Sequence, residues 1–114
     1  MSGNTTKYAE LDVTPSTATS TAAAASTSTQ VSVVTTEALV TAAGATYTFT
    51  LTNPLININT CVTAITGKGT ATTGGLTQIF TTPAAGSVVI IMQNVTLAAL
   101  NGTVKLYISL FNLS

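Results

Sequence analysis

The segment ATYTFTLTN alternates strictly between apolar side chains and threonine. Its apolar positions are Tyr47, Phe49 and Leu51, and each position beside them is a threonine. A period of two is typical of a β-strand that buries one face. Threonine suits the other face, because its side chain is both polar and β-branched. The pattern predicts a half-buried strand and restricts the chain to folds that cover such a face.

Several further stretches carry the signals of strands: QVSVVTTEALV (30–40), LININTCVTAIT (55–66), LTQIFTT (76–82), SVVIIMQN (87–94) and TVKLYISLFNL (103–113). Turn signals separate strands about every 8–12 residues, a spacing typical of sandwiches and barrels, and no convincing helical period follows residue 30. The strongest turn signal is Asn101-Gly102, a pair that favours a two-residue hairpin. The spacing predicts an all-β fold, namely an antiparallel jelly-roll-like β-sandwich or barrel.

The last of these stretches has two faces of different character. One set of alternate positions is aliphatic and is expected in the core: Val104, Leu106, Ile108 and Leu110. The opposite face carries Tyr107 and Phe111, which are too apolar for a surface that stays in water. This face is a candidate contact with another subunit, and coverage by the second sheet or by the N-terminal segment is the alternative. We predict that Tyr107 and Phe111 bind a partner protein.

Residues 15–30, PSTATSTAAAASTSTQ, contain no charge, no aromatic ring and no side chain larger than threonine or glutamine. Serine and threonine on both sides of the alanines lower helix propensity, so a stable helix is not expected. Ordering a backbone costs roughly 1–2 kcal/mol per residue, and such small side chains offset little of it by burial. If the segment is ordered, backbone hydrogen bonds must hold it, most simply at the sheet edge of another chain.

The chain is therefore divided near residue 30. Residues 1–30 are predicted to form an extended Thr/Ser/Ala-rich arm, and residues 31–114 a β domain. Few sizeable apolar side chains occur in the arm, and three of them, Tyr8, Leu11 and Val13, are predicted to bind a partner.

Charged residues are rare in this chain. It has three lysines, three acids, no arginine and no histidine, and its net charge is zero. Polarity comes instead from 26 threonines and nine serines. So little charge gives little protection against self-association, which suits a surface that partners cover; a soluble monomer hydrated by threonine and asparagine is the alternative. Three lysines cannot make the basic patch that nucleic-acid binding needs.

The residue types that catalysis uses are scarce. Without histidine, no Ser-His or Cys-His pair can form, and the acids are scattered as Glu10, Asp12 and Glu37. We expect solvated charges, no enzyme activity, no cofactor and no metal site. Cys61 lies in an apolar, β-branched setting and is expected to be buried as a small hydrophobe. Residues 67–75, GKGTATTGG, predict an exposed loop and lack the spacing of a phosphate-binding loop.

No stretch of the sequence is typical of a membrane protein. The most apolar run, residues 88–100, is short and is interrupted by Gln93 and Asn94, whereas a spanning helix needs roughly 20 apolar residues. The N-terminus shows no basic region followed by an apolar core. We expect that the protein does not associate with membranes. We also expect that it is made in the cytoplasm.

The C-terminal third of the chain resembles the closing strands of small jelly-roll decoration, or cement, proteins of tailed-phage capsids. The resemblance lies in a Gly-led hydrophobic strand that ends in asparagine (Gly86 to Asn94), in Leu100-Asn101-Gly102, and in the alternating strand from Val104 to Leu110. It implies a small jelly roll that decorates and stabilises a capsid by clamping neighbouring subunits on the outer surface of the virion. The implied partners are the major capsid protein and the protein itself, as a dimer or trimer.

Two other hypotheses remain open at this stage. A head-fibre domain would bind a host receptor or a carbohydrate through its loops, and would need exposed aromatic and acidic side chains there. Residues 67–75 offer neither. A pilus or surface-layer subunit would need a secretion signal. The sequence therefore favours a non-catalytic structural virion protein that is made in the host cytoplasm.

Overall fold

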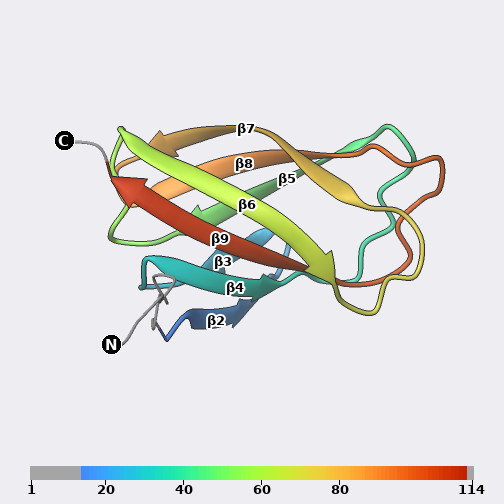
Figure 1. The fold of residues 1–114 in the computed structure, drawn as a ribbon, viewed down its shortest axis with the longest axis horizontal. Helices are drawn as coiled ribbons and strands as arrows, with labels where there is room; N and C mark the ends of the chain where they lie inside the picture. Colours follow the sequence, from blue (N-terminus) through green and yellow to red (C-terminus); the bar gives the residue numbers. More distant parts are fainter. Residues whose placement is uncertain (1–13, 113–114) are drawn as a thin grey trace, which may run out of the picture.

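The computed structural model describes residues 14–112, which form an all-β sandwich (Figure 1). Its strands are β2 (Ser16–Thr19), β3 (Ala24–Ser26), β4 (Val31–Thr35), β5 (Thr46–Thr52), β6 (Thr60–Lys68), β7 (Leu76–Ala84), β8 (Ser87–Asn94) and β9 (Val104–Asn112). The predicted β-class and sandwich are confirmed. The strand predicted from the strict alternation is β5, with Tyr47, Phe49 and Leu51 buried and the threonines outward or half-buried.

Two four-stranded sheets make up the sandwich. The β9 sheet has the order β2-β4-β9-β6, and the β8 sheet has the order β3-β5-β8-β7. In Figure 1 the β9 sheet lies toward the viewer and the β8 sheet behind it. The prediction of an antiparallel arrangement is wrong at two edges, because β2 pairs in parallel with β4 and β3 pairs in parallel with β5. Both are therefore mixed sheets.

The core lies between the two sheets and is built from alternate residues of the central strands. Leu106 and Ile108 of β9 are 0% and 1% exposed, so the predicted inner face of this strand is confirmed. Strand β8 alternates between buried and half-buried residues, with Val88, Ile90 and Met92 in the core.

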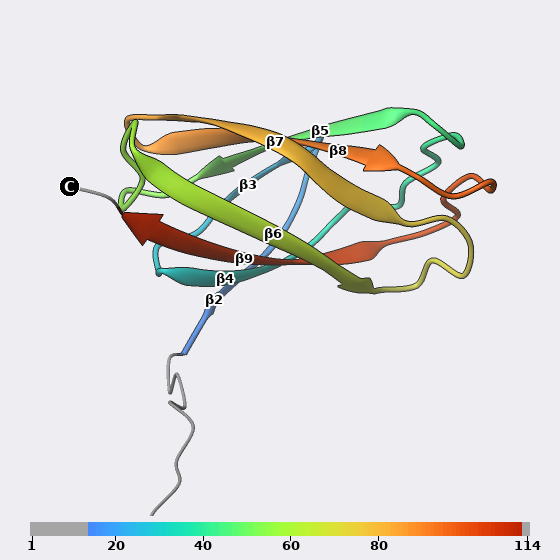
Figure 2. The ribbon, with the colours of Figure 1, turned by 45° about the horizontal axis from the view of Figure 1, so that its top comes forward.

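The described part of the predicted arm, residues 14–30, belongs to the sandwich. β2 forms one edge of the β9 sheet, and β3 forms one edge of the β8 sheet (Figure 2). The expected sheet-edge bonds exist, but the edges are those of the same chain: the Thr50 amide donates to the Ala23 carbonyl, and the Thr27 amide to the Thr52 carbonyl, both at 2.9 Å. The prediction that this segment binds the sheet edge of another chain is therefore wrong for residues 14–30, which pair with strands of their own chain. Tyr8, Leu11 and Val13 lie outside the described residues.

A tight turn carries the chain from β2 to β3 and so from one sheet to the other. Ala22 and Ala23 have φ angles of 51° and 59°. Thr21 and Ala24, which flank these two residues, are joined by two backbone hydrogen bonds. Positive φ at both central residues is the conformation of a type I′ turn, which usually contains asparagine and glycine. Since alanine is strained there, other contacts must hold this turn.

Those contacts come from Glu37, which sequence analysis took for an isolated solvated charge. Its carboxylate accepts hydrogen bonds from the Ser20 hydroxyl (2.6 Å), the Ala23 amide (3.0 Å) and the Tyr47 hydroxyl (3.0 Å). Burial raises the pKa of the Glu37 carboxyl, but these bonds outweigh it and hold the pKa below its usual value. The acid therefore fastens the β2–β3 turn to the sandwich, and the prediction that Glu37 is isolated is wrong.

The same cluster predicts a loss of stability at high pH. Burial, assisted by the adjacent Glu37 carboxylate, raises the pKa of Tyr47 to about 12, compared with about 10 in an unfolded chain. The folded state therefore keeps a proton that the unfolded state releases, and stability falls as pH rises from about 10 through 12. The loss is on the order of 2–3 kcal/mol.

Urea unfolding at several pH values checks this prediction. Tyr47→Phe has no ionisable hydroxyl, so its free energy of unfolding should fall less steeply over the same pH range. Its overall stability is also lower, because the bond to Glu37 is lost, and only the difference in slope is diagnostic. Equal slopes for the two proteins would mean that Tyr47 does not cause the loss of stability at high pH.

Two buried asparagines fasten loops to the ends of strands. Asn94, at the end of β8, donates from Nδ2 to the carbonyls of Thr41 (3.0 Å) and Ala98 (2.8 Å). Its Oδ1 accepts from the backbone and the hydroxyl of Thr96. Asn53 makes similar bonds to residues 27–29 at the opposite end. Both side chains are 0% exposed, so the loops that they bind are held rigidly.

The Asn101-Gly102 pair does not form the hairpin that its sequence favours. β8 and β9 belong to different sheets, and residues 95–103 cross between them. The Asn101 side chain instead accepts from the amides of Thr72 and Thr73 (2.7 and 3.0 Å). It thereby joins the crossover to the glycine-rich loop.

Candidate interaction surface

Strand register brings outward side chains of the β9 sheet into rows that run across the strands. We call this outer surface the β9 face. Its rows, from one end to the other, are Gly67–Lys105–Thr35, Ile65–Tyr107–Val33, Thr63–Ser109–Val31 and Cys61–Phe111. Each row contains a residue of β6 and its partner on β9, and the first three extend to β4. Residues from three separate segments of the sequence therefore share one sheet face, on which the Thr63–Ser109 row lies between the Ile65–Tyr107 row and Phe111.

Three large side chains of the β9 face are exposed to solvent. Ile65, Tyr107 and Phe111 are 64%, 44% and 63% exposed. Lys105 alone is charged among the residues of these rows, and it lies at one end. Monomeric surfaces rarely carry contiguous apolar patches beyond a few hundred Å² unless they bind something. The exposure of these three apolar side chains on one side of a sheet makes the β9 face a candidate contact surface.

The structure places the predicted partner-binding residues Tyr107 and Phe111 on this face, four positions apart on β9. Sequence analysis missed Ile65, which pairs directly with Tyr107. The outward position of Ile65 could have been predicted from the alternation within residues 60–66, because Cys61, Thr63 and Ile65 occupy the outward positions. What the alternation does not give is the register that aligns Ile65 with Tyr107.

Tyr107 also has a structural role within the sheet. A Cβ atom placed on Gly67 would collide with the Tyr107 ring, so the ring lies directly over this glycine. An aromatic ring beside a glycine on a neighbouring strand covers backbone that would otherwise be open to water. Tyr107 therefore stabilises the β6–β9 pair in addition to presenting its outer edge to solvent.

Cys61 is exposed on the β9 face, opposite Phe111. The expectation of a buried thiol is wrong. Its position explains the error: Thr60, Val62 and Ala64 of the same strand take the inward positions, and the apolar neighbourhood seen in the sequence belongs to the opposite side of the strand.

The outer edge of β6 is closed by the side chain of Gln78 on β7. Oε1 of Gln78 accepts from the Ala64 amide (2.7 Å), and Nε2 donates to the Val62 carbonyl (3.1 Å). Figure 2 shows β6 and β7 running side by side, although they belong to different sheets. Because an amide side chain occupies backbone groups that an edge strand would offer, a partner has access to the face of this sheet rather than to its β6 edge.

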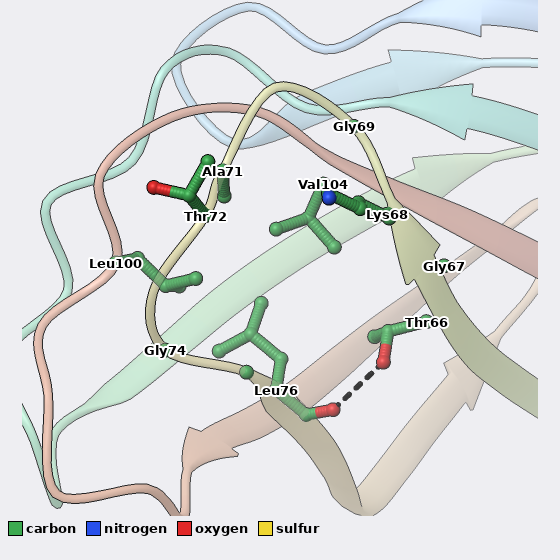
Figure 3. A pocket seen from close by; sticks show the side chains of 11 residues that line it. Thr66, Gly67, Lys68, Gly69, Ala71, Thr72, Gly74, Leu76, Leu100 and Val104 are labelled. Carbon is green, nitrogen blue, oxygen red and sulfur yellow. Dashed lines mark hydrogen bonds between the residues drawn. The ribbon is translucent and has the colours of Figure 1, made fainter.

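A cavity of about 360 Å³ lies at the loop end of the sandwich, between the glycine-rich loop and β9. In Figure 3, Leu76, Leu100 and Val104 point into it, and the Thr66 hydroxyl donates to the Leu76 carbonyl at 2.9 Å. Lys68 supplies the charge of the lining. Cβ atoms on Gly69 or Gly74 would collide with Thr103 or Leu100. Gly69 and Gly74 are thus explained by the packing of this loop on the crossover, residues 95–103.

The same end of the molecule carries a second exposed apolar group, which we call the loop tip. It consists of Val40, Val95 and Leu97, which are 84%, 63% and 101% exposed. Asn94 and the Leu100 amide hold the two loops together through the Thr41 carbonyl. The loop tip contains no aromatic ring.

Within residues 14–112, no group of three or more His, Cys, Asp or Glu side chains is placed to hold a metal ion. The same residues contain no helix that could cross a membrane.

Comparisons with protein-family models, with curated protein sequences and with solved structures found no match to this chain.

Proposed function

We propose that this protein is a structural component of a virion, which decorates the outer surface of a capsid and stabilises it by clamping neighbouring subunits. The observation that carries the proposal is the β9 face, with Ile65, Tyr107 and Phe111 exposed on a rigid sheet. The proposal assigns the protein no catalysis and no cofactor. The contacts are with the major capsid protein and with further copies of the protein, and Tyr8, Leu11 and Val13 are proposed to contribute.

The near absence of charge supports a contact made by apolar and backbone groups. Three lysines and three acids in the whole chain can make few interfacial ion pairs. Screening by salt acts on charges, so we expect attachment to be nearly independent of ionic strength. Such a contact suits a permanent structural role.

The jelly-roll part of the proposal is supported by the number and layering of the strands. Residues 14–112 contain eight strands in two four-stranded sheets, which matches the strand number and layering of a double-sheet jelly roll, an architecture found in viral capsid domains. The parallel pairing of β2 and β3 at the sheet edges departs from a wholly antiparallel arrangement. The C-terminal segment that resembles decoration proteins forms β8, the crossover and β9.

A head-fibre or host-binding domain is the second candidate. The cavity at the loop end is the observation that favours it, since loop clusters are where β-sandwiches bind ligands. Carbohydrate sites use exposed aromatic rings, and the residues that line this cavity include none. The clamp is therefore the function that the described surface supports best.

Co-sedimentation with capsids stripped of this protein tests the proposal. Wild-type protein should bind at full occupancy, and occupancy should change by less than tenfold between low and high salt. Phe111→Ser should weaken binding at least tenfold, because it removes an exposed anchor without opening the core. Thr48→Ser, on the outer face of the β8 sheet, is the matched control and should bind normally.

Two results would contradict the proposal. One is failure of the wild-type protein to bind stripped capsids. The other is full occupancy of Phe111→Ser, which would leave the β9 face without a role in attachment. Circular dichroism of each variant shows whether it is folded.

A further inference from the structure

We propose that the β9 face binds a second copy of this chain through a two-fold axis that runs across the strands, between the Tyr107 row and the Ser109 row. This inference rests on the proposed function and deepens it, because it names the neighbour that the face contacts. Two-fold interfaces use the same patch on both copies and must therefore be self-complementary. The β9 face meets this requirement in side-chain size and in charge.

Size complementarity follows from the order of the rows. The proposed axis places the Tyr107 row of one copy over the Ser109 row of the other, so Tyr107 faces Ser109 and Ile65 faces Thr63. Ile65 then enters the space above Thr63, and the outer edge of Tyr107, whose ring lies over Gly67, meets the small Ser109, on both sides of the axis. Successive rows are about 7 Å apart, because each outward position is two residues from the next. The axis thus brings all rows of the two copies into contact.

Charge complementarity follows from the position of Lys105 at the end of the face. The same axis places Lys105 of each copy over Phe111 of the other. An ammonium group over an aromatic ring is attracted by the negative face of the ring, and the lysine stem covers apolar surface. An axis parallel to the strands would instead place the two lysines against each other. Like charges disfavour that arrangement, so the charge pattern selects the axis that crosses the strands.

The second copy fits this face better than a charged partner would. The rows contain no acid and one lysine per copy, and the chain as a whole has zero net charge, so two copies do not repel each other. Gln78 closes the β6 edge, so two β9 sheets do not pair through that edge.

The size of the face sets the strength of the contact. The seven residues of β9 from Lys105 to Phe111 extend about 20 Å, and the three strands that carry the rows span about 10 Å. A patch of these dimensions buries less than the roughly 800 Å² per partner of a standard interface. The dimer is therefore weak in free solution and is reinforced on a capsid, where neighbouring copies are held close together.

Sedimentation equilibrium of the purified protein, with no capsid present, tests the inference. Over a range from micromolar to about millimolar protein, the mass should rise from one chain to two. Lys105→Glu should weaken association at least tenfold, because an acid over Phe111 is repelled. An axis parallel to the strands, which sets the two lysines against each other, predicts instead that Lys105→Met strengthens association and that Lys105→Glu associates like the wild-type protein. Thr48→Lys, on the other sheet, is the control and should associate like the wild-type protein.

The native thiol provides an independent measurement. In the proposed dimer Cys61 lies over the Tyr107 ring that covers Gly67 of the second copy, so the reaction of Cys61 with a thiol reagent should slow as the protein concentration rises. In Ser109→Glu, which fills the space that Tyr107 of the second copy would enter, the rate should be independent of concentration. Thermal unfolding of each variant at low concentration shows that the fold is retained.

The outcomes separate this inference from the proposed function. A wild-type protein that stays monomeric at millimolar concentration, yet loses capsid binding in Phe111→Ser, would overturn the dimer and assign the β9 face to the capsid protein. A protein that dimerises as described but does not bind capsids would overturn the virion role and leave the dimer standing. Unchanged association of Lys105→Glu would overturn the proposed axis.

Discussion

Replacing Ile108 with alanine is expected to lower the free energy of unfolding by ~2–5 kcal/mol. Ile108 is 1% exposed and lies at the centre of β9, paired with Ser32 on one side and Ala64 on the other. Truncation removes buried apolar surface and leaves a cavity that rigid neighbouring strands cannot fill. Leu106→Ala, at the adjacent inward position, should lose a similar amount. Urea unfolding at low protein concentration measures both.

Ile65→Ala is the matched control for this experiment. It removes the same atoms from the neighbouring strand, but from a side chain that is 64% exposed. Because little of that surface is buried, we expect a loss below about 1 kcal/mol. Equal losses for Ile65→Ala and Ile108→Ala would mean that the inward and outward faces of the β9 sheet are wrongly assigned.

Asn94→Asp is expected to be the most damaging polar substitution among the described residues. The side chain keeps its shape but loses both hydrogen-bond donors, so the Thr41 and Ala98 carbonyls lose their partner and face a carboxylate instead. A buried polar group without a partner costs about 1–3 kcal/mol. The expected loss in the free energy of unfolding is therefore about 3 kcal/mol or more. Thermal and urea unfolding measure it.

Asn59→Asp is the control, because Asn59 is an exposed asparagine in the loop before β6. Its substitution should change the free energy of unfolding by no more than about 0.5 kcal/mol. If Asn94→Asp were as stable as Asn59→Asp, the loops around Thr41 and Ala98 would have to be held by other contacts.

Much of the strand content could be predicted from the sequence, because alternation is a local property. Tyr47, Phe49 and Leu51 had to share one face of a strand, and Leu106 and Ile108 another. The outward position of Tyr107 and Phe111 followed from the same periodicity, and both are exposed in the structure. Periodicity specifies which side of a strand is buried. It therefore predicted Tyr107 and Phe111 of the candidate surface but not their neighbour Ile65.

The errors concern contacts between residues that are distant in the sequence. Cys61 was assigned to the core from its neighbours in sequence, although those neighbours point to the opposite side. Glu37 was taken as isolated, because Ser20 and Tyr47, which bond to it, are 17 and 10 positions away. The hairpin expected at Asn101 was replaced by a crossover, since β9 pairs with β4 and β6 rather than with β8.

The sequence by itself therefore determined the β-class of this protein, most of its longer strands, and the buried face of β5 and β9. The tertiary structure decided which edges pair: that residues 16–26 add a parallel strand to each sheet of their own chain, and that Ile65 lies beside Tyr107. The physical reason is that side-chain burial leaves a period-two pattern in the sequence. Pairing between strands is made by backbone groups that every residue except proline shares, so the choice of edge leaves little trace in residue types.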